Sequence, residues 1–134
     1  MSVQVRPVEP GEIDAVRQLL LDNGWQHRVG STPQLAELIS RSHLALVAVA
    51  EGKVVGFVRA LGDGLTNGYV SMLVVAESHR RRGVGRALMQ AVMGDNDQIT
   101  WVLRAARDES VMAFYERLGF VRSTVAMERT RRSA

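Results

Sequence analysis

The sequence predicts an α/β protein of the α+β kind, in which a mixed, largely antiparallel sheet is flanked by helices. Three observations lead to this fold class. Two apolar runs joined by Glu51-Gly52-Lys53 predict a β-hairpin near the middle of the chain. Apolar residues recur at helical spacing both before and after that hairpin. With 134 residues, 46% of them hydrophobic, the chain has material for one core, so we expect a single domain over residues 1–134.

The first half of the chain is predicted to form five elements from the spacing of its apolar side chains. They are a strand over residues 3–8, helices over 12–23 and 32–39, and hairpin strands over 44–50 and 54–60. Gly24 supplies a stop for the first helix. Thr32 as N-cap and Pro33 as first helical residue open the second. We expect residues 25–28, between the two helices, to form a polar and aromatic loop.

The second half continues with alternating strands and helices. The predicted elements are a strand over 69–75, a helix over 83–93, a strand over 99–103, a helix over 110–118, and a final strand or extended arm over 120–129. Gly94-Asp95-Asn96-Asp97 ends the first of these helices, and Gly119 ends the second. The predicted order is therefore β-α-α-β-β-β-α-β-α-β.

The composition excludes several classes of protein. With no cysteine there is no disulfide framework, thiolate zinc site or cysteine nucleophile. His27, His43 and His79 lack metal-ligand spacing, so we expect no metal cofactor. No apolar run reaches the roughly 18–20 residues that cross a bilayer, and the first residues have no signal-peptide pattern. We therefore expect a cytoplasmic protein without a membrane partner.

The net charge of +3 comes almost entirely from arginine, because Lys53 is the only lysine. One arginine cluster comprises residues 80–82 with Arg86, and another lies at residues 129–132. We expect the second cluster to be a solvated chain end. The first leaves a small nucleic-acid-binding domain open as an alternative. Because no aromatic platform or second basic stripe accompanies it, we expect no nucleic-acid partner.

The most informative segment is residues 73–88, in which a strand leads through an arginine- and glycine-rich turn into a helix. The free N–H groups at a helix start favour anions, and glycine lets a phosphate approach the main chain. This pattern indicates a diphosphate ligand, with a plain basic helix start as the alternative. The dinucleotide fingerprint is excluded because Leu88 stands at the third glycine position, and no Gly-Lys-Ser/Thr of a P-loop is present.

Two motifs in this chain resemble a known family, the GNAT superfamily of N-acetyltransferases. Arg80-x-x-Gly83-x-Gly85 after Leu73-x-Val75 is similar to the family's motif for the acyl-CoA pyrophosphate. Residues 113–120, Ala-Phe-Tyr-Glu-Arg-Leu-Gly-Phe, resemble its downstream signature. The resemblance implies an acetyl-CoA-dependent N-acetyltransferase, an acyltransferase that acts on a primary amine.

The resemblance also implies roles for particular residues. The backbone of Leu73, Val74 and Val75 would pair with the pantetheine arm, and Arg80 would open the pyrophosphate loop. Backbone amides would cradle the pyrophosphate at Arg81, Arg82, Gly83, Val84, Gly85 and Arg86. Tyr115 would be the general acid toward the leaving thiolate, its alternative role being a core aromatic. Asp108 would contact the pantetheine arm or cap the last helix, and we favour the cap.

This chain departs from the family pattern at Ser71-Met72, where many relatives carry an acidic pair that includes the general base. Asp63, Glu109, His27 and ordered water are the remaining candidates for proton removal. The departure also leaves open a non-catalytic module on the same fold that binds CoA as a sensor.

The acceptor side is weakly encoded. The loops at residues 25–28 and 62–67 would border an acceptor pocket, and the small size of the chain favours a small-molecule amine. An amino acid, a polyamine, an arylalkylamine, an antibiotic and a protein N-terminus all remain open as acceptors. A homodimer is expected from the exposed edge of the predicted final strand.

Overall fold

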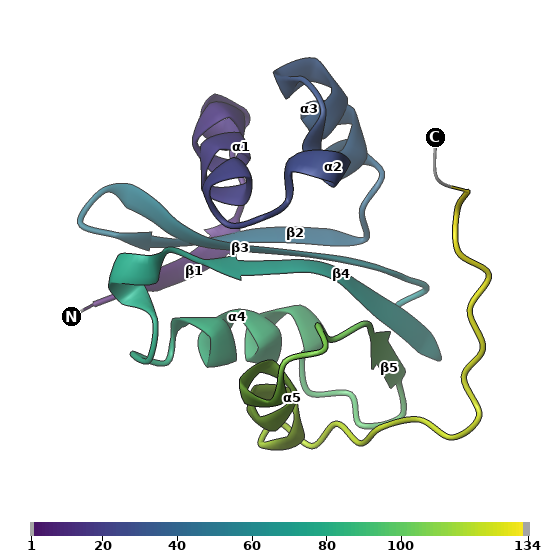
Figure 1. The fold of residues 1–134 in the computed structure, drawn as a ribbon. Helices are drawn as coiled ribbons and strands as arrows, with labels where there is room; N and C mark the ends of the chain where they lie inside the picture. Colours follow the sequence, from purple (N-terminus) through teal and green to yellow (C-terminus); the bar gives the residue numbers. More distant parts are fainter. Residues whose placement is uncertain (1, 133–134) are drawn as a thin grey trace. The chain divides into compact units, whose positions relative to one another are not determined.

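A five-stranded sheet with the order β1-β2-β3-β4-β5 organises most of the computed structural model, which describes residues 2–132 (Figure 1). The strands are β1 (Gln4–Pro7), β2 (Leu44–Ala50), β3 (Lys53–Gly62), β4 (Asn67–Val75) and β5 (Thr100–Leu103). Neighbours from β1 to β4 are antiparallel, and β5 runs parallel to β4. The predicted fold class, a mixed and largely antiparallel sheet flanked by helices, is confirmed.

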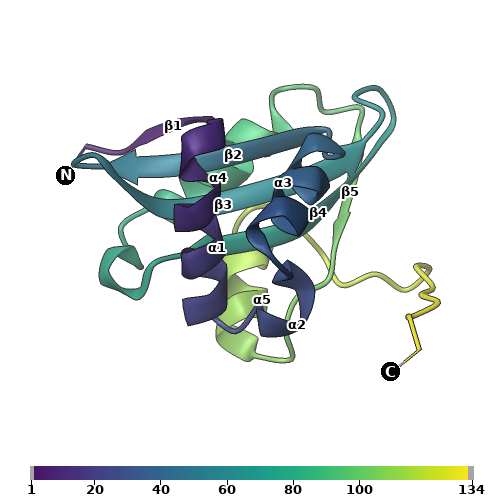
Figure 2. The ribbon, with the colours of Figure 1, turned by 90° about the horizontal axis from the view of Figure 1, so that it is seen from above.

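The chain divides after Arg104 into two units, and the sheet belongs wholly to the first. The helices of this first unit are η1 (Pro10–Glu12), α1 (Ile13–Asp22), α2 (Gln26–Val29), α3 (Thr32–Ser40), η2 (Glu77–His79) and α4 (Val84–Met93). Helices α1 to α3 cover one face of the sheet and α4 covers the other (Figures 1 and 2). The sheet is therefore the middle layer of this unit.

The core on the α1 and α3 face is built from apolar side chains of helices and strands together. Its members include Val16 and Leu20 of α1, Leu35 of α3, Val47 of β2, Phe57 of β3, and Met72 and Val74 of β4. On the opposite face, α4 buries the side chains Val84, Leu88, Met89 and Val92, which recur at helical spacing. Both faces of the central strands are thus covered by helices.

Two local predictions on this face were wrong. The N-cap of α3 is Ser31, not Thr32, because the Ser31 hydroxyl accepts the backbone N–H of Gln34 while the Gln34 side chain accepts the N–H of Ser31. Thr32 is free to donate its hydroxyl to Asp14 of α1 instead. The loop expected over residues 25–28 is mostly helical: α2 (Gln26–Val29) includes three of its residues, and Val29 is buried in the core.

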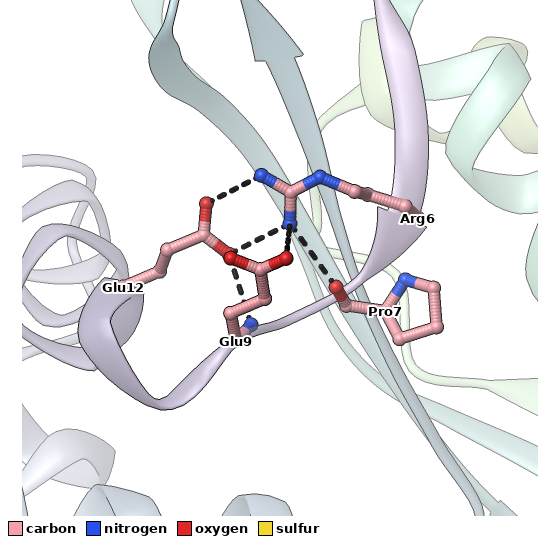
Figure 3. Close-up of polar contacts among 4 residues, drawn as sticks. All are labelled: Arg6, Pro7, Glu9 and Glu12. Carbon is pink, nitrogen blue, oxygen red and sulfur yellow. Dashed lines mark hydrogen bonds and ion pairs between the residues drawn. The ribbon is translucent and has the colours of Figure 1, made fainter.

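The entry of the chain into α1 is fixed by an ion pair (Figure 3). Arg6 of β1 donates two parallel hydrogen bonds to the carboxylate of Glu12, at 2.9 and 2.7 Å. The same carboxylate accepts the backbone N–H of Glu9 at 2.9 Å. These bonds lower the pKa of Glu12, chiefly through the hydrogen bond from Arg6. The ion pair therefore joins the first strand to the first helix.

The second unit contains α5 (Glu109–Glu116) followed by irregular chain through residue 132. Of the two alternatives predicted for residues 120–129, the final strand does not form, and the segment is an extended arm. Val121, Val125 and Met127 are 86%, 86% and 96% exposed, so the apolar alternation that predicted a strand is not used for packing. A strand needs a hydrogen-bonded neighbour, which alternation alone does not provide. The argument for a homodimer from this strand edge therefore falls away.

We predict that Gly68→Ala destabilises the first unit by about 1–3 kcal/mol through overpacking. A methyl group on Gly68 of β4 would lie within 2.7 Å of three ring atoms of Trp101 on β5. Gly11→Ala is the matched control, because a methyl group there meets nothing within 4 Å. Urea unfolding of both variants measures the difference, and equal midpoints would show that Trp101 does not hold β5 against β4.

We also predict that the ion pair stabilises the fold only above acidic pH. Because the pKa of Glu12 is below its ordinary value of 4.5, its stabilisation is present above that value and is lost as pH falls through the lower, folded-state pKa. Glu12→Gln should therefore unfold at lower urea than the native protein at neutral pH, and the two midpoints should converge as the pH falls from neutral through the lowered pKa of Glu12. A gap that is constant over this pH range would contradict the assignment.

Candidate functional site

The outer edge of β4 lacks a strand partner over its second half. β3 pairs with β4 up to Val75, whereas β5 pairs only with Asn67 to Val70. Within residues 2–132, no strand covers the outer edge of residues 71–75. Leu73, Val74 and Val75, predicted from the resemblance to bind a pantetheine arm, all lie on this stretch. An extended ligand can add to such an edge through main-chain hydrogen bonds.

The loop after β4 leads directly into the N-terminus of α4. The residues predicted to hold the pyrophosphate run from Arg80 to Arg86, and the last three of them belong to the start of α4. Gly83 is the N-cap with a φ of 82°, a left-handed conformation that glycine adopts without strain. The first backbone N–H groups of this ten-residue helix have no partner inside the helix. The loop therefore presents donors and positive potential suited to a phosphate group.

Arg80 fixes the loop to the rest of the first unit. Its Nε donates to the backbone oxygen of Val75 at 3.1 Å. One of its terminal nitrogens donates to the side-chain oxygen of Asn23, the residue that follows α1. The side chain thus ties the end of β4 to the end of α1, so Arg80, although exposed, positions the loop on the first unit.

In the second unit, Asp108 is the N-cap of α5, as favoured from the sequence. Its carboxylate accepts the backbone N–H of Ser110 at 2.8 Å and the Ser110 hydroxyl at 2.6 Å. These hydrogen bonds, the hydroxyl first, lower the pKa of Asp108. Asp108 is therefore ionised at neutral pH and engaged with the start of the helix.

Tyr115 lies near the end of α5 within a small aromatic cluster. Its ring meets those of Phe114 and Phe120 edge to face, with centroid distances of 5.0 and 5.8 Å. Burial raises the pKa of the Tyr115 hydroxyl above its ordinary value of 10.0. The phenol is consequently protonated at neutral pH, which is the state that a general acid requires.

The candidates for a general base differ in what surrounds them. Asp63 accepts backbone N–H groups of Leu65, Thr66 and Asn67 and the Thr66 hydroxyl, which holds the pKa of its carboxyl well below the usual range. A carboxylate so stabilised is a very weak base at neutral pH. Glu109 forms a 3.0 Å ion pair with Arg122. His27 lies on α2.

Arg59 on β3 is a further residue of interest that the sequence analysis missed. It is the one charged side chain buried within the described residues 2–132. Its guanidinium donates to the hydroxyls of Ser42 and Ser71. Ser71 belongs to the Ser71-Met72 pair at which the family resemblance implied acidic residues. The available signal was a single charged residue inside the apolar run at residues 54–60. From sequence alone, that pattern indicates a strand whose one charged residue is exposed. The pairing register of the strand is needed to show that the residue lies on a buried face.

The part of the chain that the structure describes contains neither a metal-ligand cluster nor a membrane-spanning helix. No group of three or more histidine, aspartate or glutamate side chains gathers there as metal ligands do. Every helix there is too short or too polar to cross a bilayer.

Comparisons with known proteins identify a family model, a curated relative and similar solved structures. The family model described as an acetyltransferase (GNAT) domain matches residues 41–122. The PanD regulatory factor of Salmonella typhimurium is 36% identical over 86 residues, which cover 61% of this chain and 67% of that protein.

Among solved structures, a GNAT family acetyltransferase from Streptococcus pneumoniae has a TM-score of 0.80 at 24% identity, covering 98% of both chains. A ribosomal-protein-alanine N-acetyltransferase from Brucella melitensis has a TM-score of 0.78 at 22% identity, covering 98% of this chain and 99% of that one. These two likenesses show a shared fold. With the family model spanning more than half of the sequence, they establish that this chain belongs to the GNAT family of acetyltransferases.

Proposed function

We propose that this protein is an acetyl-CoA-dependent N-acetyltransferase that acts on a primary amine of a small molecule. One observation carries the proposal: the open outer edge of β4 leads through the glycine-containing loop into the N-terminus of α4. A main-chain edge and an anion site on one continuous segment suit a ligand with an extended arm and a diphosphate. Membership of the GNAT family, whose fold typically binds acetyl-CoA, supports this ligand.

The residues present fit acetyl-CoA in charge and in shape. Backbone groups of Leu73 to Val75 would hold the pantetheine arm, and the N–H groups of the loop through Arg86 would hold the pyrophosphate. Gly83 adds no side chain that blocks approach to the main chain. Arg81, Arg82 and Arg86 are exposed, and they add positive charge around the phosphate position. Arg80 keeps this loop at the end of β4.

Bound acetyl-CoA would supply a thioester as the acetyl donor. A backbone N–H of β4 near Val75 would donate to the carbonyl oxygen as negative charge develops on it. The protonated hydroxyl of Tyr115 would donate its proton to the departing thiolate. No nucleophilic side chain is needed for direct transfer, and the site would act chiefly by positioning the amine.

The acceptor amine must lose a proton before it reacts. An alkylammonium with a pKa near 10 costs about 4 kcal/mol to deprotonate at neutral pH. Asp63 is too weak a base for this step, and Ser71 and Met72 supply no carboxylate on β4. We therefore propose that ordered water carries the proton to solvent, with His27 and Glu109 as the remaining side-chain candidates.

A second candidate function is a CoA-binding regulatory factor without catalysis. Two observations favour it: the likeness to the PanD regulatory factor, and the absence of an acidic pair at Ser71-Met72. Such a protein would use the same β4 edge and α4 N-terminus to bind CoA. It would act on a partner protein in place of an amine.

Two measurements separate these candidates. Calorimetry with acetyl-CoA tests the shared ligand site, and thiol release from acetyl-CoA with a panel of small amines tests catalysis. Binding with amine-dependent thiol release supports the enzyme. Binding without release from any amine supports the regulatory factor, and absence of binding contradicts both.

We predict that Gly85→Glu weakens acetyl-CoA binding by more than tenfold, or roughly 1.4 kcal/mol. The variant places a side chain and a negative charge in the first turn of α4, where the phosphates would lie. Gln90→Glu is the matched control, because it adds the same charge at an exposed position of the same helix. Isothermal calorimetry compares the two, and unchanged affinity in a folded Gly85→Glu protein would refute the loop as the phosphate site.

We predict that Tyr115→Phe lowers kcat by at most about 100-fold, the low end for general acid catalysis, because a thiol is already a fair leaving group. The ring contacts with Phe114 and Phe120 remain in this variant, so melting temperature and acetyl-CoA affinity should barely change. Steady-state kinetics with an accepted amine measure kcat. An unaffected kcat would assign the proton to water, and a joint loss of stability, affinity and kcat would make the hydroxyl structural.

A further inference from the structure

Arg59 places a positive charge in the interior of the first unit. The residue is 6% exposed. It lies two positions after Phe57 and directly opposite Met72 of β4, both of which belong to the core under α1 and α3. Alternate residues of a strand, and residues opposite each other in a ladder, share a face. The guanidinium is therefore on the face of the sheet covered by α1 and α3.

The partners of this guanidinium are neutral. Its Nε donates to the hydroxyl of Ser42 at 2.9 Å, and its Nη1 donates to the hydroxyl of Ser71 at 2.7 Å. Among the described residues, no carboxylate lies within ion-pair distance of Arg59, and Nη2 has no hydrogen-bond partner. Burial lowers the pKa of the guanidinium, but arginine still keeps its charge at neutral pH. The protein thus holds a desolvated cation without a counter-ion.

A buried charge is unfavourable unless an opposite charge or a full set of hydrogen bonds stabilises it. Within residues 2–132, only Nε1 of Trp101 is a side-chain nitrogen or oxygen that is both fully buried and without a partner. Since Nη2 of Arg59 also lacks a partner, it must keep some access to solvent. An anion can therefore be expected to approach the guanidinium along its Nη1 and Nη2 edge. Two parallel N–H donors on that edge match the two oxygens of a carboxylate.

The backbone of β4 aims a second donor at the same place. Arg59 pairs with Met72 and Ala60 pairs with Val70, so Ser71 is the extra residue of a bulge. Bulges re-aim side chains, and here the Ser71 hydroxyl points to Arg59. Ser42 already donates its hydroxyl proton to the Leu38 carbonyl at 2.9 Å. The Ser71 hydroxyl has no acceptor among the described residues, so its proton is available to an anion.

We propose that Arg59 and Ser71 bind the carboxylate of the acceptor, and that the small amine acetylated by this protein is an amino acid. This inference rests on the proposed function and names its substrate class. Met72, opposite Arg59, directly precedes the Leu73 to Val75 stretch proposed to hold the pantetheine arm. At about 3.4 Å per residue, Ser71 lies roughly 7 Å along β4 from Leu73, where that stretch begins. That separation suits a small acceptor, and the cation at this point disfavours polyamines.

Paired acceptors test the inference by changing only the carboxylate. Each amino acid is compared with its carboxamide, which keeps the amine and removes the negative charge. The amine of the carboxamide is less basic, so a larger fraction is neutral, and a preference for the acid cannot come from the amine. We expect kcat/KM to be about 10- to 100-fold higher for the preferred acid than for its carboxamide, as for one charge-assisted bidentate contact. A ratio near one in the native protein would overturn the inference.

Arg59→Met removes the charge while keeping much of the apolar stem. The acid-to-amide ratio should fall to about one, the KM for acetyl-CoA should stay the same, and the melting temperature should not fall. Arg41→Met is the control, since Arg41 follows α3 and its side chain is 77% exposed. Ser71→Ala provides a second variant, expected to reduce the ratio several-fold while retaining Arg59. Persistence of the native ratio in Arg59→Met, or in Ser71→Ala if the first variant does not fold, would refute the assignment.

A binding measurement keeps this inference separate from the proposed function. N-acetylglycine and N-acetylglycinamide are compared as ligands by thermal shift in the presence of CoA. Stabilisation of the native protein by the acid alone, lost in Arg59→Met, supports a carboxylate site even if no amine is acetylated and the enzymatic function fails. Equal responses to acid and amide would refute the site even if amines of another class are acetylated.

Discussion

The outer edge of β4 is the constraint on which the proposed site depends. β3 satisfies one edge of this strand to its end, whereas the shorter β5 leaves the other edge open after Val70. Open main-chain donors and acceptors need partners, and an extended ligand arm can provide them. Arg80 then holds the following loop against Val75, so that the start of α4 comes at the end of the same strand. One strand thus joins a main-chain edge to an anion site.

The same strand carries a bulge at Ser71, whose hydroxyl accepts a hydrogen bond from Arg59 of the neighbouring strand. Where the family resemblance implies an acidic pair, this chain brings together a hydroxyl and the buried guanidinium of Arg59. In the proposed site, β4 thus lacks a local carboxylate base at Ser71-Met72 and offers a binding group for an anion instead. The residues at this one place therefore bear both on the general base and on the acceptor.

Much of the fold followed from periodicity and turn residues. The hairpin strand Leu44–Ala50 was predicted to the residue, and the main helices ended within two residues of the prediction. Capping was harder, because Ser31, Thr32 and Asp108 are all suitable caps. Asp108 has no competitor beside it, whereas Ser31 and Thr32 are adjacent and only Ser31 is placed to exchange hydrogen bonds with Gln34. The predicted final strand failed because alternation of apolar residues does not supply a neighbouring strand.

By itself, the sequence determined what depends on neighbours in the chain. The glycine-containing turn before α4, the hairpin and the cap of α5 belong to this group, because backbone conformation and local hydrogen bonds are set within a few residues. Only the tertiary structure decided which side chains meet across strands. Arg59 meets Ser71 through a bulged register, and Arg80 meets Asn23 across 57 positions of sequence. Burial and charge at these places depend on strand register, and a shift of one residue would turn each side chain to the other face of the sheet.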